Sequence, residues 1–258
     1  MFGEKPLVFN PQVASKKPTN KQSCPFCERE GLENIIATKE DCIWLTNKYA
    51  TLQKTEQTLI IESKKHLGDI SNYSVLENRK IFSFAVSKWF EMIALKKYKN
   101  VLMYKNHGPL SGGSLRHPHM QIVGLEDNEP YKQIQWENFK GIQVAQTKQF
   151  EINISQNPLV GFCEFNVIVD TTDVNSLADG VKSVVEYVLQ DYFHGKCDSY
   201  NLFFYLLDGK IICKIIPRFV VSPYYLGYGL AQVNDDVRLR EISTELLTKM
   251  NGKSSIAI

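Results

Sequence analysis

The chain has 258 residues, of which 43% are hydrophobic and 22% are charged, and its formal net charge is +2 at pH 7. This composition is ordinary for a globular protein with a sizeable core, in one large domain or two small ones. The balanced charge gives no indication of a nucleic-acid partner. The sequence has no apolar run of about 18 residues, and its first residues lack the pattern of a signal peptide. We therefore expect a cytoplasmic protein that binds neither nucleic acid nor membrane.

The first half of the sequence predicts strands, one long helix and further strands. Ser74 and Glu77 have the spacing of a capping box, and apolar residues follow them with helical periodicity up to the lysines at 96–99. β-branched and apolar runs predict the strands. The predicted strands are 42–47, 58–63, 101–106 and 118–124, with a loop at 107–113 between the last two.

The second half repeats this order, which suggests an internal duplication. It predicts a strand, a helix that ends at Gly195, two more strands and a final helix. When the prolines are aligned, Ile216 and Arg218 stand where the first half has His117 and His119. We expect two related α+β halves, residues 1–135 and 136–258. The predicted elements are the strands 165–171, 201–207 and 214–222 and the helices 176–195 and 235–250.

Cys24-Pro25-Phe26-Cys27 is the first half of a common zinc pattern, because two thiolates two residues apart can hold one ion from a tight turn. No second C-x-x-C follows, so the remaining ligands must come from distant histidines. A thioredoxin-like redox pair is the alternative, although such a pair normally opens a helix after a strand. The four other cysteines are expected to be small buried side chains in apolar or mixed stretches. The candidate histidines are His66, His107, His117, His119 and His194.

Two of the five histidines, His117 and His119, are separated by a single proline and follow a Ser-Gly-Gly-Ser turn. On a strand, residues i and i+2 share a face. Both histidines could therefore be ligands, or one could be a ligand and the other a nucleophile. The turn allows close backbone approach, and its N–H groups could hold phosphate oxygens. A glycine-rich hairpin with two incidental histidines is the remaining interpretation.

The segment "NHGPLSGGSLRHPHMQ", residues 106–121, resembles the active-site segment of galactose-1-phosphate uridylyltransferases, which belong to the histidine triad (HIT) superfamily. Nucleotide-sugar and diadenosine tetraphosphate phosphorylases share this fold. The resemblance implies two HIT-like halves, each an antiparallel sheet with a long helix, of which only the first carries the catalytic motif. It also implies a structural zinc ion and a homodimer whose sites borrow residues from the partner. The implied zinc ligands are Cys24, Cys27, His66 and His117.

The resemblance further implies a ping-pong nucleotidyltransferase or phosphorylase that acts on a nucleoside diphosphate sugar or a dinucleoside polyphosphate. His119 would be the nucleophile, oriented by the main-chain carbonyl of His117. Gln121 and Ser114 would hold phosphoryl oxygens together with Asn106, Gly112 and Gly113. "TNKYATL" and "YLGYG" resemble the segments that reach the nucleotide and the sugar. They would contribute Asn47, Lys48 and Tyr228 to substrate binding.

Three positions depart from the family pattern. Lys48 replaces an aspartate that contacts the ribose, and Gly229 replaces a glutamate in the sugar-contacting loop. Lys16 or Lys17 stands where the family has arginines that bind phosphate. A lysine binds phosphate as a single point charge, whereas an arginine can form two parallel hydrogen bonds. Three other hypotheses remain: a nucleotide hydrolase, a nucleotide-binding or regulatory protein without turnover, and a zinc-stabilised interaction protein. Gln121 in place of a third triad histidine favours transfer over hydrolysis.

Overall fold

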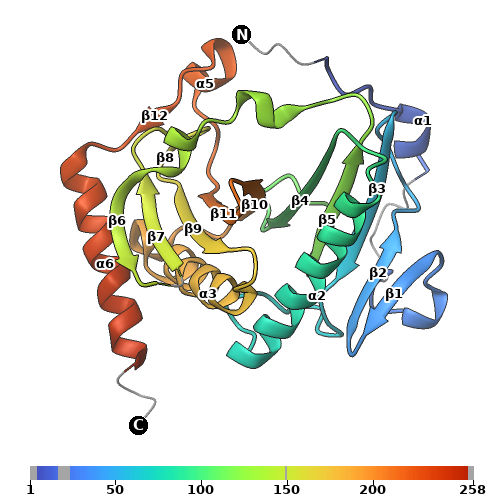
Figure 1. The fold of residues 1–258 in the computed structure, drawn as a ribbon, viewed down its shortest axis with the longest axis horizontal. Helices are drawn as coiled ribbons and strands as arrows, with labels where there is room; N and C mark the ends of the chain where they lie inside the picture. Colours follow the sequence, from blue (N-terminus) through green and yellow to red (C-terminus); the bar gives the residue numbers. More distant parts are fainter. Residues whose placement is uncertain (1–4, 17–23, 149, 255–258) are drawn as a thin grey trace. The chain divides into compact units, whose positions relative to one another are not determined.

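The computed structural model describes residues 5–148 and 150–254, apart from residues 17–23 (Figure 1). The chain forms two compact units. The first comprises residues 1–69, 83–105 and 114–134, and the second comprises 70–82, 106–113 and 135–258. The loop before the His-Pro-His segment therefore belongs to the unit that is built mainly from the second half of the chain.

The two halves of the chain place their strands in the same order. The first half has the order β1-β2-β3-β5-β4, and the second has β6-β7-β9-β11-β10. Within each set the neighbouring strands are antiparallel. In each half a long helix follows the third strand. This correspondence confirms the prediction of an α+β fold made of two duplicated halves.

The elements of the first half are α1 (Pro11–Ala14), the 3₁₀ turn η1 (Arg29–Gly31), β1 (Ile35–Lys39), β2 (Cys42–Thr46), β3 (Thr55–Ile61), α2 (Val75–Ala94), β4 (Asn100–His107) and β5 (His119–Leu125). The predicted cap of α2 is confirmed, because Ser74 Oγ accepts the N–H of Glu77 at 3.1 Å. Trp89 is fully buried, and its indole N–H donates to the carbonyl of Val101 on β4 at 2.9 Å. The helix is thereby fixed to the sheet.

The elements of the second half are η2 (Pro130–Gln133), η3 (Trp136–Phe139), β6 (Gly141–Gln146), β7 (Phe150–Ser155), β8 (Gly161–Phe162), β9 (Phe165–Asp170), α3 (Val174–Gln190), α4 (Tyr192–Gly195), β10 (Tyr200–Leu207), β11 (Lys210–Pro217), α5 (Pro223–Tyr228), β12 (Gln232–Val233) and α6 (Asp236–Ser254). β8 and β12 form a small parallel pair. None of the helices in the described ranges has the length and apolar character needed to span a bilayer.

The predicted helix 176–195 was wrong in its last turn. α3 ends at Gln190, and the chain then turns through Phe193 and His194, whose φ angles are +52° and +57°. These left-handed conformations interrupt the α-helical hydrogen bonding, so 192–195 forms a separate turn. The run of apolar residues continues through the turn, which is why periodicity alone extended the helix. Strands β1, β6 and β7 had no sequence prediction.

Helices α3 and α6 cover the sheet of the second unit (Figure 1). α3 buries an apolar stripe that includes Leu177, Val181 and Val184. Gly180 lets this helix approach β9 closely, because a Cβ there would lie 2.7 Å from Val167 Cγ1. α6 packs on β6, and Ser243 Oγ donates to the carbonyl of Gln143 at 2.9 Å.

A charged pair is buried in the second unit. Lys214 and Glu164 are fully buried and form an ion pair at 2.9 Å. Lys214 also donates to Asn138 O and Ser155 Oγ, each at 2.8 Å. Glu164 accepts three backbone N–H groups, from residues 159–161. Burial lowers the pKa of Lys214, and Glu164 opposes this shift. Each charge is thus compensated by its partner and by hydrogen bonds.

We expect Lys214→Met to lower the free energy of unfolding by about 3–5 kcal/mol, because it leaves a buried carboxylate without its counter-ion. The double variant Lys214→Met/Glu164→Gln should lose less than the sum of the single variants, because it buries no unpaired charge. Urea denaturation of the four proteins measures this coupling. Additive losses would contradict the assignment of a compensated pair.

Candidate functional site

Two cysteines and two histidines converge in the first unit. Cys24 and Cys27 lie in a tight turn closed by the Cys27 N–H and the Cys24 carbonyl at 3.0 Å. His66 follows β3, and His117 precedes β5. Cys27 Sγ lies 3.4 Å from His66 Nδ1 and 3.5 Å from His117 Nδ1, and Cys24 Sγ lies 3.6 Å from His117 Nδ1. All four donor atoms lie within 4.8 Å of one another, so the cluster can hold a metal ion.

The ring of His117 is fixed by a second hydrogen bond. Its Nε2 lies 2.9 Å from the carbonyl oxygen of Ser63, and His117 is fully buried. A carbonyl can only accept, so Nε2 carries the proton and donates. The lone pair of His117 therefore lies on Nδ1, which faces the cysteine sulfurs. A backbone partner on the second ring nitrogen is the usual way in which a ligand histidine is oriented.

His119 opens β5 and is 9% exposed. Its Nδ1–H donates to the main-chain carbonyl of His117 at 2.8 Å. Because Nδ1 carries the proton, Nε2 of the neutral ring has the lone pair. Burial lowers the pKa of His119 to about 4, against the opposing effect of the His117 carbonyl. The imidazole is therefore neutral near pH 7.

Phe26 contacts both histidines. Its ring centroid lies 5.8 Å from that of His117 and 5.5 Å from that of His119, with edge-to-face geometry in each pair. Phe26 is buried in a cluster with Ile61 and other apolar residues of β2 and β3. The Cys-Pro-Phe-Cys turn thus contributes the cysteines of the cluster and a side chain that packs against the neighbouring imidazole.

Gln121 lies on β5 opposite Tyr104 of β4. The Tyr104 hydroxyl donates to Gln121 Oε1 at 2.9 Å. This contact leaves the Gln121 Nε2 group as a donor. Tyr104 orients the glutamine amide, and no local sequence pattern predicts this pair because it depends on the register of β4 and β5.

The glycine-rich loop belongs to the second unit up to Gly113. Asn106 Oδ1 accepts a hydrogen bond from Asn201 Nδ2 at 2.7 Å. Gly112 has φ +82°, a conformation that favours glycine, and it is exposed. The N–H of Gly113 donates to Ser111 Oγ at 3.3 Å. Ser114, at the start of the next segment of the first unit, is exposed.

The other expected substrate contacts lie on the surface of their own units. Asn47 Oδ1 accepts the N–H of Tyr49 at 2.9 Å. Lys48 forms an exposed ion pair with Glu33 at 2.9 Å. Tyr228, on α5, is 78% exposed. Lys17 lies outside the described residues.

Gly229 has a conformational reason to be glycine. It ends α5 with φ +66°, and its N–H donates to the carbonyl of Tyr225 at 2.9 Å. A residue with a Cβ is strained at this left-handed C-terminal position. The glutamate that the resembling enzymes carry here would therefore not fit this helix end without strain.

The four remaining cysteines are buried, as the sequence predicted. Burial raises the pKa of the Cys42 thiol to about 12, and it also raises the pKa values of Cys163, Cys197 and Cys213. These thiols are protonated at neutral pH and are poor ligands and nucleophiles.

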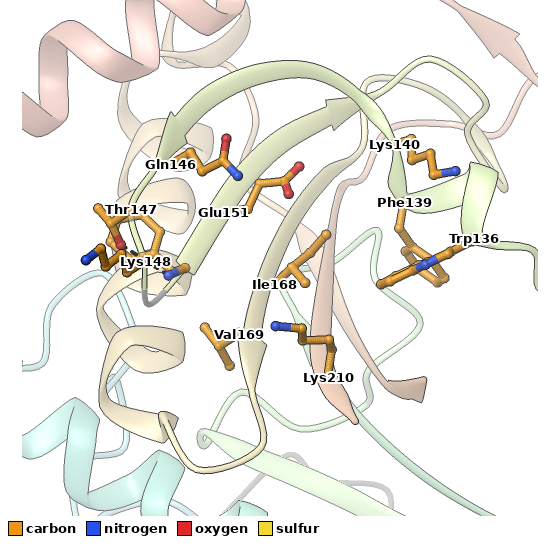
Figure 2. Close-up of a pocket in the computed structure, with 11 residues that line it drawn as sticks. Trp136, Phe139, Lys140, Gln146, Thr147, Lys148, Glu151, Ile168, Val169 and Lys210 are labelled. Atoms are coloured by element: carbon orange, nitrogen blue, oxygen red, sulfur yellow. Dashed lines mark hydrogen bonds between the residues drawn. The ribbon is translucent and has the colours of Figure 1, made fainter. Parts of the chain in front are cut away.

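A hollow of about 340 Å³ lies on the second unit (Figure 2). Aromatic and lysine side chains line it, among them Trp136, Lys140 and Lys210. Lys140 pairs with Glu137 at 3.2 Å, and Lys210 pairs with Asp170 at 2.7 Å. None of the site residues predicted from the sequence lines this hollow. Its lysine charges are largely compensated, so we assign it no part in the site.

With this strand order, the chain shares its fold with solved structures of a uridylyltransferase and an ADP-glucose phosphorylase. A solved uridylyltransferase matches with a TM-score of 0.71 and 15% identity, covering 90% of this chain and 92% of that one. An ADP-glucose phosphorylase from Arabidopsis thaliana, solved with bound ADP-glucose, matches with a TM-score of 0.69 and 14% identity, covering 93% and 94% of the two chains.

The chain belongs to the DUF4931 family. Residues 9–128 match its N-terminal domain and 131–248 its C-terminal domain, both described as domains of unknown function. A DUF4931 protein from Bacillus cereus ATCC 10987 is 40% identical, with a TM-score of 0.76, and the match covers 84% of this chain and 99% of that one. The search of the curated proteins finds no match.

We expect Cys24→Ala to lower the bound metal to a small fraction of the wild-type content and to lower Tm, because it removes one of four ligands. His119→Ala should keep the metal, because Nδ1 of His119 bonds to a carbonyl and its ring is outside the cluster. Elemental analysis of the purified proteins measures both. Loss of metal in His119→Ala would show that the two histidines have been assigned the wrong roles.

Proposed function

We propose that this protein is a nucleotidyltransferase or phosphorylase that acts through a covalent nucleotidyl-histidine at His119. The observation that carries the proposal is the 2.8 Å hydrogen bond from His119 Nδ1–H to the His117 carbonyl, which leaves the Nε2 lone pair for attack. The chain shares its fold with proteins named as a uridylyltransferase and an ADP-glucose phosphorylase. This likeness supports the same general chemistry.

In the first step, Nε2 of His119 attacks the α-phosphorus of a nucleoside diphosphate compound. A P–N bond forms, and the P–O bond to the leaving phosphate or sugar phosphate breaks. The Nδ1 proton stays in its hydrogen bond to the His117 carbonyl, which stabilises the positive charge that develops on the ring. In the second step, an acceptor phosphate attacks the same phosphorus, and the P–N bond breaks to regenerate neutral His119.

Donors from both segments that flank the nucleophile would bind the phosphoryl oxygens. Gln121 Nε2 is available because Tyr104 occupies the other end of the amide. Ser114 Oγ, Asn106 Nδ2 and the Gly112 N–H are further candidates. The Gly113 N–H already donates to Ser111 and contributes less. Uncharged donors of this kind stabilise charge on phosphorus without supplying a proton for hydrolysis.

The nucleoside contact would differ from that of the resembling enzymes. Lys48 replaces their aspartate, but its ion pair brings the Glu33 carboxylate within 2.9 Å of its ammonium group. Glu33 would supply the carboxylate for a ribose hydroxyl, and Asn47 would contact the nucleotide. Gly229 removes the carboxylate expected for a hexose, so we propose a phosphate or another sugar-free acceptor.

The metal of the Cys24, Cys27, His66 and His117 cluster would be structural zinc. Typical Zn–S and Zn–N bonds of about 2.3 and 2.05 Å place sulfur and nitrogen about 3.6 Å apart in a tetrahedron. The three measured sulfur–nitrogen separations are 3.4, 3.5 and 3.6 Å. Four protein ligands leave no open position, so zinc would hold the turn beside His117. Free thiols at these ligands fit a reducing cytoplasm.

We further propose a homodimer formed through the segment 220–230, which includes α5. Its side chains are unusually apolar and exposed for a surface helix: Tyr224 is 56% exposed, Leu226 74% and Tyr228 78%. Contiguous exposed apolar side chains mark interaction surfaces. A second copy is the proposed occupant, because Tyr228 would then reach a substrate bound by the partner.

We expect intact-protein mass spectrometry to detect a mass gain of one nucleotide after mixing with a nucleotide-sugar or dinucleoside polyphosphate donor. UDP-glucose, ADP-glucose and diadenosine tetraphosphate form the initial panel. The sample is kept at neutral pH or above, because a phosphoramidate is acid-labile. The mass of the adduct identifies the nucleotide.

His119→Ala should form no adduct, because it removes the attacking nitrogen. His194→Asn is the matched control and should react like the wild type, because His194 is exposed and lies on α4. A metal-loaded wild-type protein that binds nucleotide but forms no adduct with a broad panel of donors would favour a binding protein without turnover.

Leu226→Asp should convert the dimer to a monomer, because it places a charge in the proposed apolar interface. Sedimentation velocity measures the change. Leu76→Asp is the control, because Leu76 is 65% exposed at the start of α2. A wild-type protein that is monomeric at micromolar concentration would refute the dimer.

A further inference from the structure

The second half carries an arginine at the position that corresponds to the nucleophile. Arg218 follows Pro217 as His119 follows Pro118. Arg218 is partly buried just after β11, and it is not part of the Cys-His cluster. The segment has therefore lost the histidine chemistry, and its contacts indicate a different role.

Arg218 is connected by hydrogen bonds to the glycine-rich loop. Its Nη1 donates to Asn201 Oδ1 at 3.2 Å. Asn201 Nδ2 then donates to Asn106 Oδ1 at 2.7 Å and to the Ser111 carbonyl at 3.0 Å. Asn201 is 2% exposed, so these bonds are shielded from water. All of these residues belong to the second unit.

The backbone near Arg218 supports the same loop. The Arg218 N–H donates to the Ser199 carbonyl at 2.8 Å, and Ser199 Oγ accepts the Leu110 N–H at 3.1 Å. Gly108 has φ +84°, and a Cβ on it would lie 2.2 Å from the Asp198 carbonyl oxygen. The loop is therefore closely packed on the chain that precedes β10.

The Arg218 guanidinium and the Ser111 carbonyl together set the direction of these amide hydrogen bonds. An arginine can only donate, so Asn201 must present its oxygen to Arg218 and its NH₂ group to Asn106 and Ser111. Asn106 must then present Oδ1 to Asn201. Its own NH₂ group has no acceptor within the described parts of the chain and remains a donor. Without the cation, Asn201 Oδ1 would lose its donor, and only the Ser111 carbonyl would hold the orientation of this amide.

We propose that Arg218 is a positioning residue for phosphate binding: through Asn201 it holds the loop 106–113 and keeps the Asn106 amide as a donor to a phosphate oxygen. The inference rests on the proposed function for the identity of the substrate, but binding of an inorganic anion tests it separately. The second half of the chain, which lacks the His-Pro-His motif, would thus orient a donor of the loop 106–113.

Binding of inorganic pyrophosphate to the full-length protein, measured by calorimetry, tests the proposal. Arg218→Met should weaken binding about tenfold, the loss typical of a charge-assisted contact. Arg218→Lys should recover most of the affinity, because an ammonium can still donate to Asn201. Asn201→Asp keeps the partner of Arg218 but cannot donate to Asn106 or Ser111, so it should also weaken binding about tenfold.

Arg240→Met is the control for loss of one positive charge, because Arg240 is exposed on α6. This variant should bind pyrophosphate as tightly as the wild type. The Tm of every variant should lie within a few degrees of the wild-type value, which would show that weaker binding is not caused by unfolding. Unchanged affinity in Arg218→Met, an equal loss in Arg240→Met, or no pyrophosphate binding by the wild type would overturn the proposal.

The nucleotidyl adduct is a separate readout. If donors label His119, Arg218→Met should lower kcat more than it raises KM, and Arg218→Lys should restore kcat. An adduct that forms with unchanged kinetics in Arg218→Met would overturn the inference while supporting the proposed function. The wild type could instead form no adduct while Arg218→Met and Asn201→Asp still bind pyrophosphate more weakly than the wild type. That result would refute the proposed function and support the positioning role of Arg218.

Discussion

The site depends on the way in which His117 is held. Its ring bonds to the Ser63 carbonyl through one nitrogen and faces Cys24 and Cys27 with the other, and its own carbonyl accepts the proton of His119. One residue thereby links the cysteine turn, the end of β3 and the start of β5. The tautomers of both histidines follow from these two carbonyl contacts. Both nitrogens of the His117 ring have polar neighbours, and its main-chain carbonyl is held separately by His119.

The two halves carry different polar side chains on the same strand order. The first half provides the Cys-His cluster and His119, and Phe26 packs against both. The second half keeps the strand order and has replaced the two histidines with Ile216 and Arg218. Lys214, on the same strand as Ile216, forms a buried ion pair with Glu164, which lies just before β9. Duplication preserved the scaffold, and the polar side chains on it diverged.

Much of the fold was predictable because strand and helix periodicities are local. The strands around residues 42–63 and 101–124, the cap at Ser74 and the repeated order of elements are examples. The convergence of Cys24, Cys27, His66 and His117 was an implication of the family resemblance. Spacing alone could not select His66 and His117 among five histidines, because ligand choice depends on tertiary contacts.

Other features had no local signal. Tyr104 and Gln121 meet only because of the register of β4 and β5, and Ser63 acts through its backbone. The left-handed turn at Phe193 and His194 interrupts a helix whose apolar pattern continues. Residues such as Asn201 are informative only once their partners at positions 106 and 111 are known. No local sequence pattern predicts contacts between residues that are about 90 positions apart.

The tight approach of Gly108 to Asp198 has a consequence for how the chain could be divided. The loop at 106–113, which precedes His119 in the sequence, belongs by its contacts to the unit formed mainly by residues after 135. A fragment cut between the two family domains would retain the Cys-His cluster and His119, yet it would lose the residues against which that loop packs. The duplicated halves are thus no longer separable modules. A substitution at position 198 or 199 would therefore act directly on a loop of the first half.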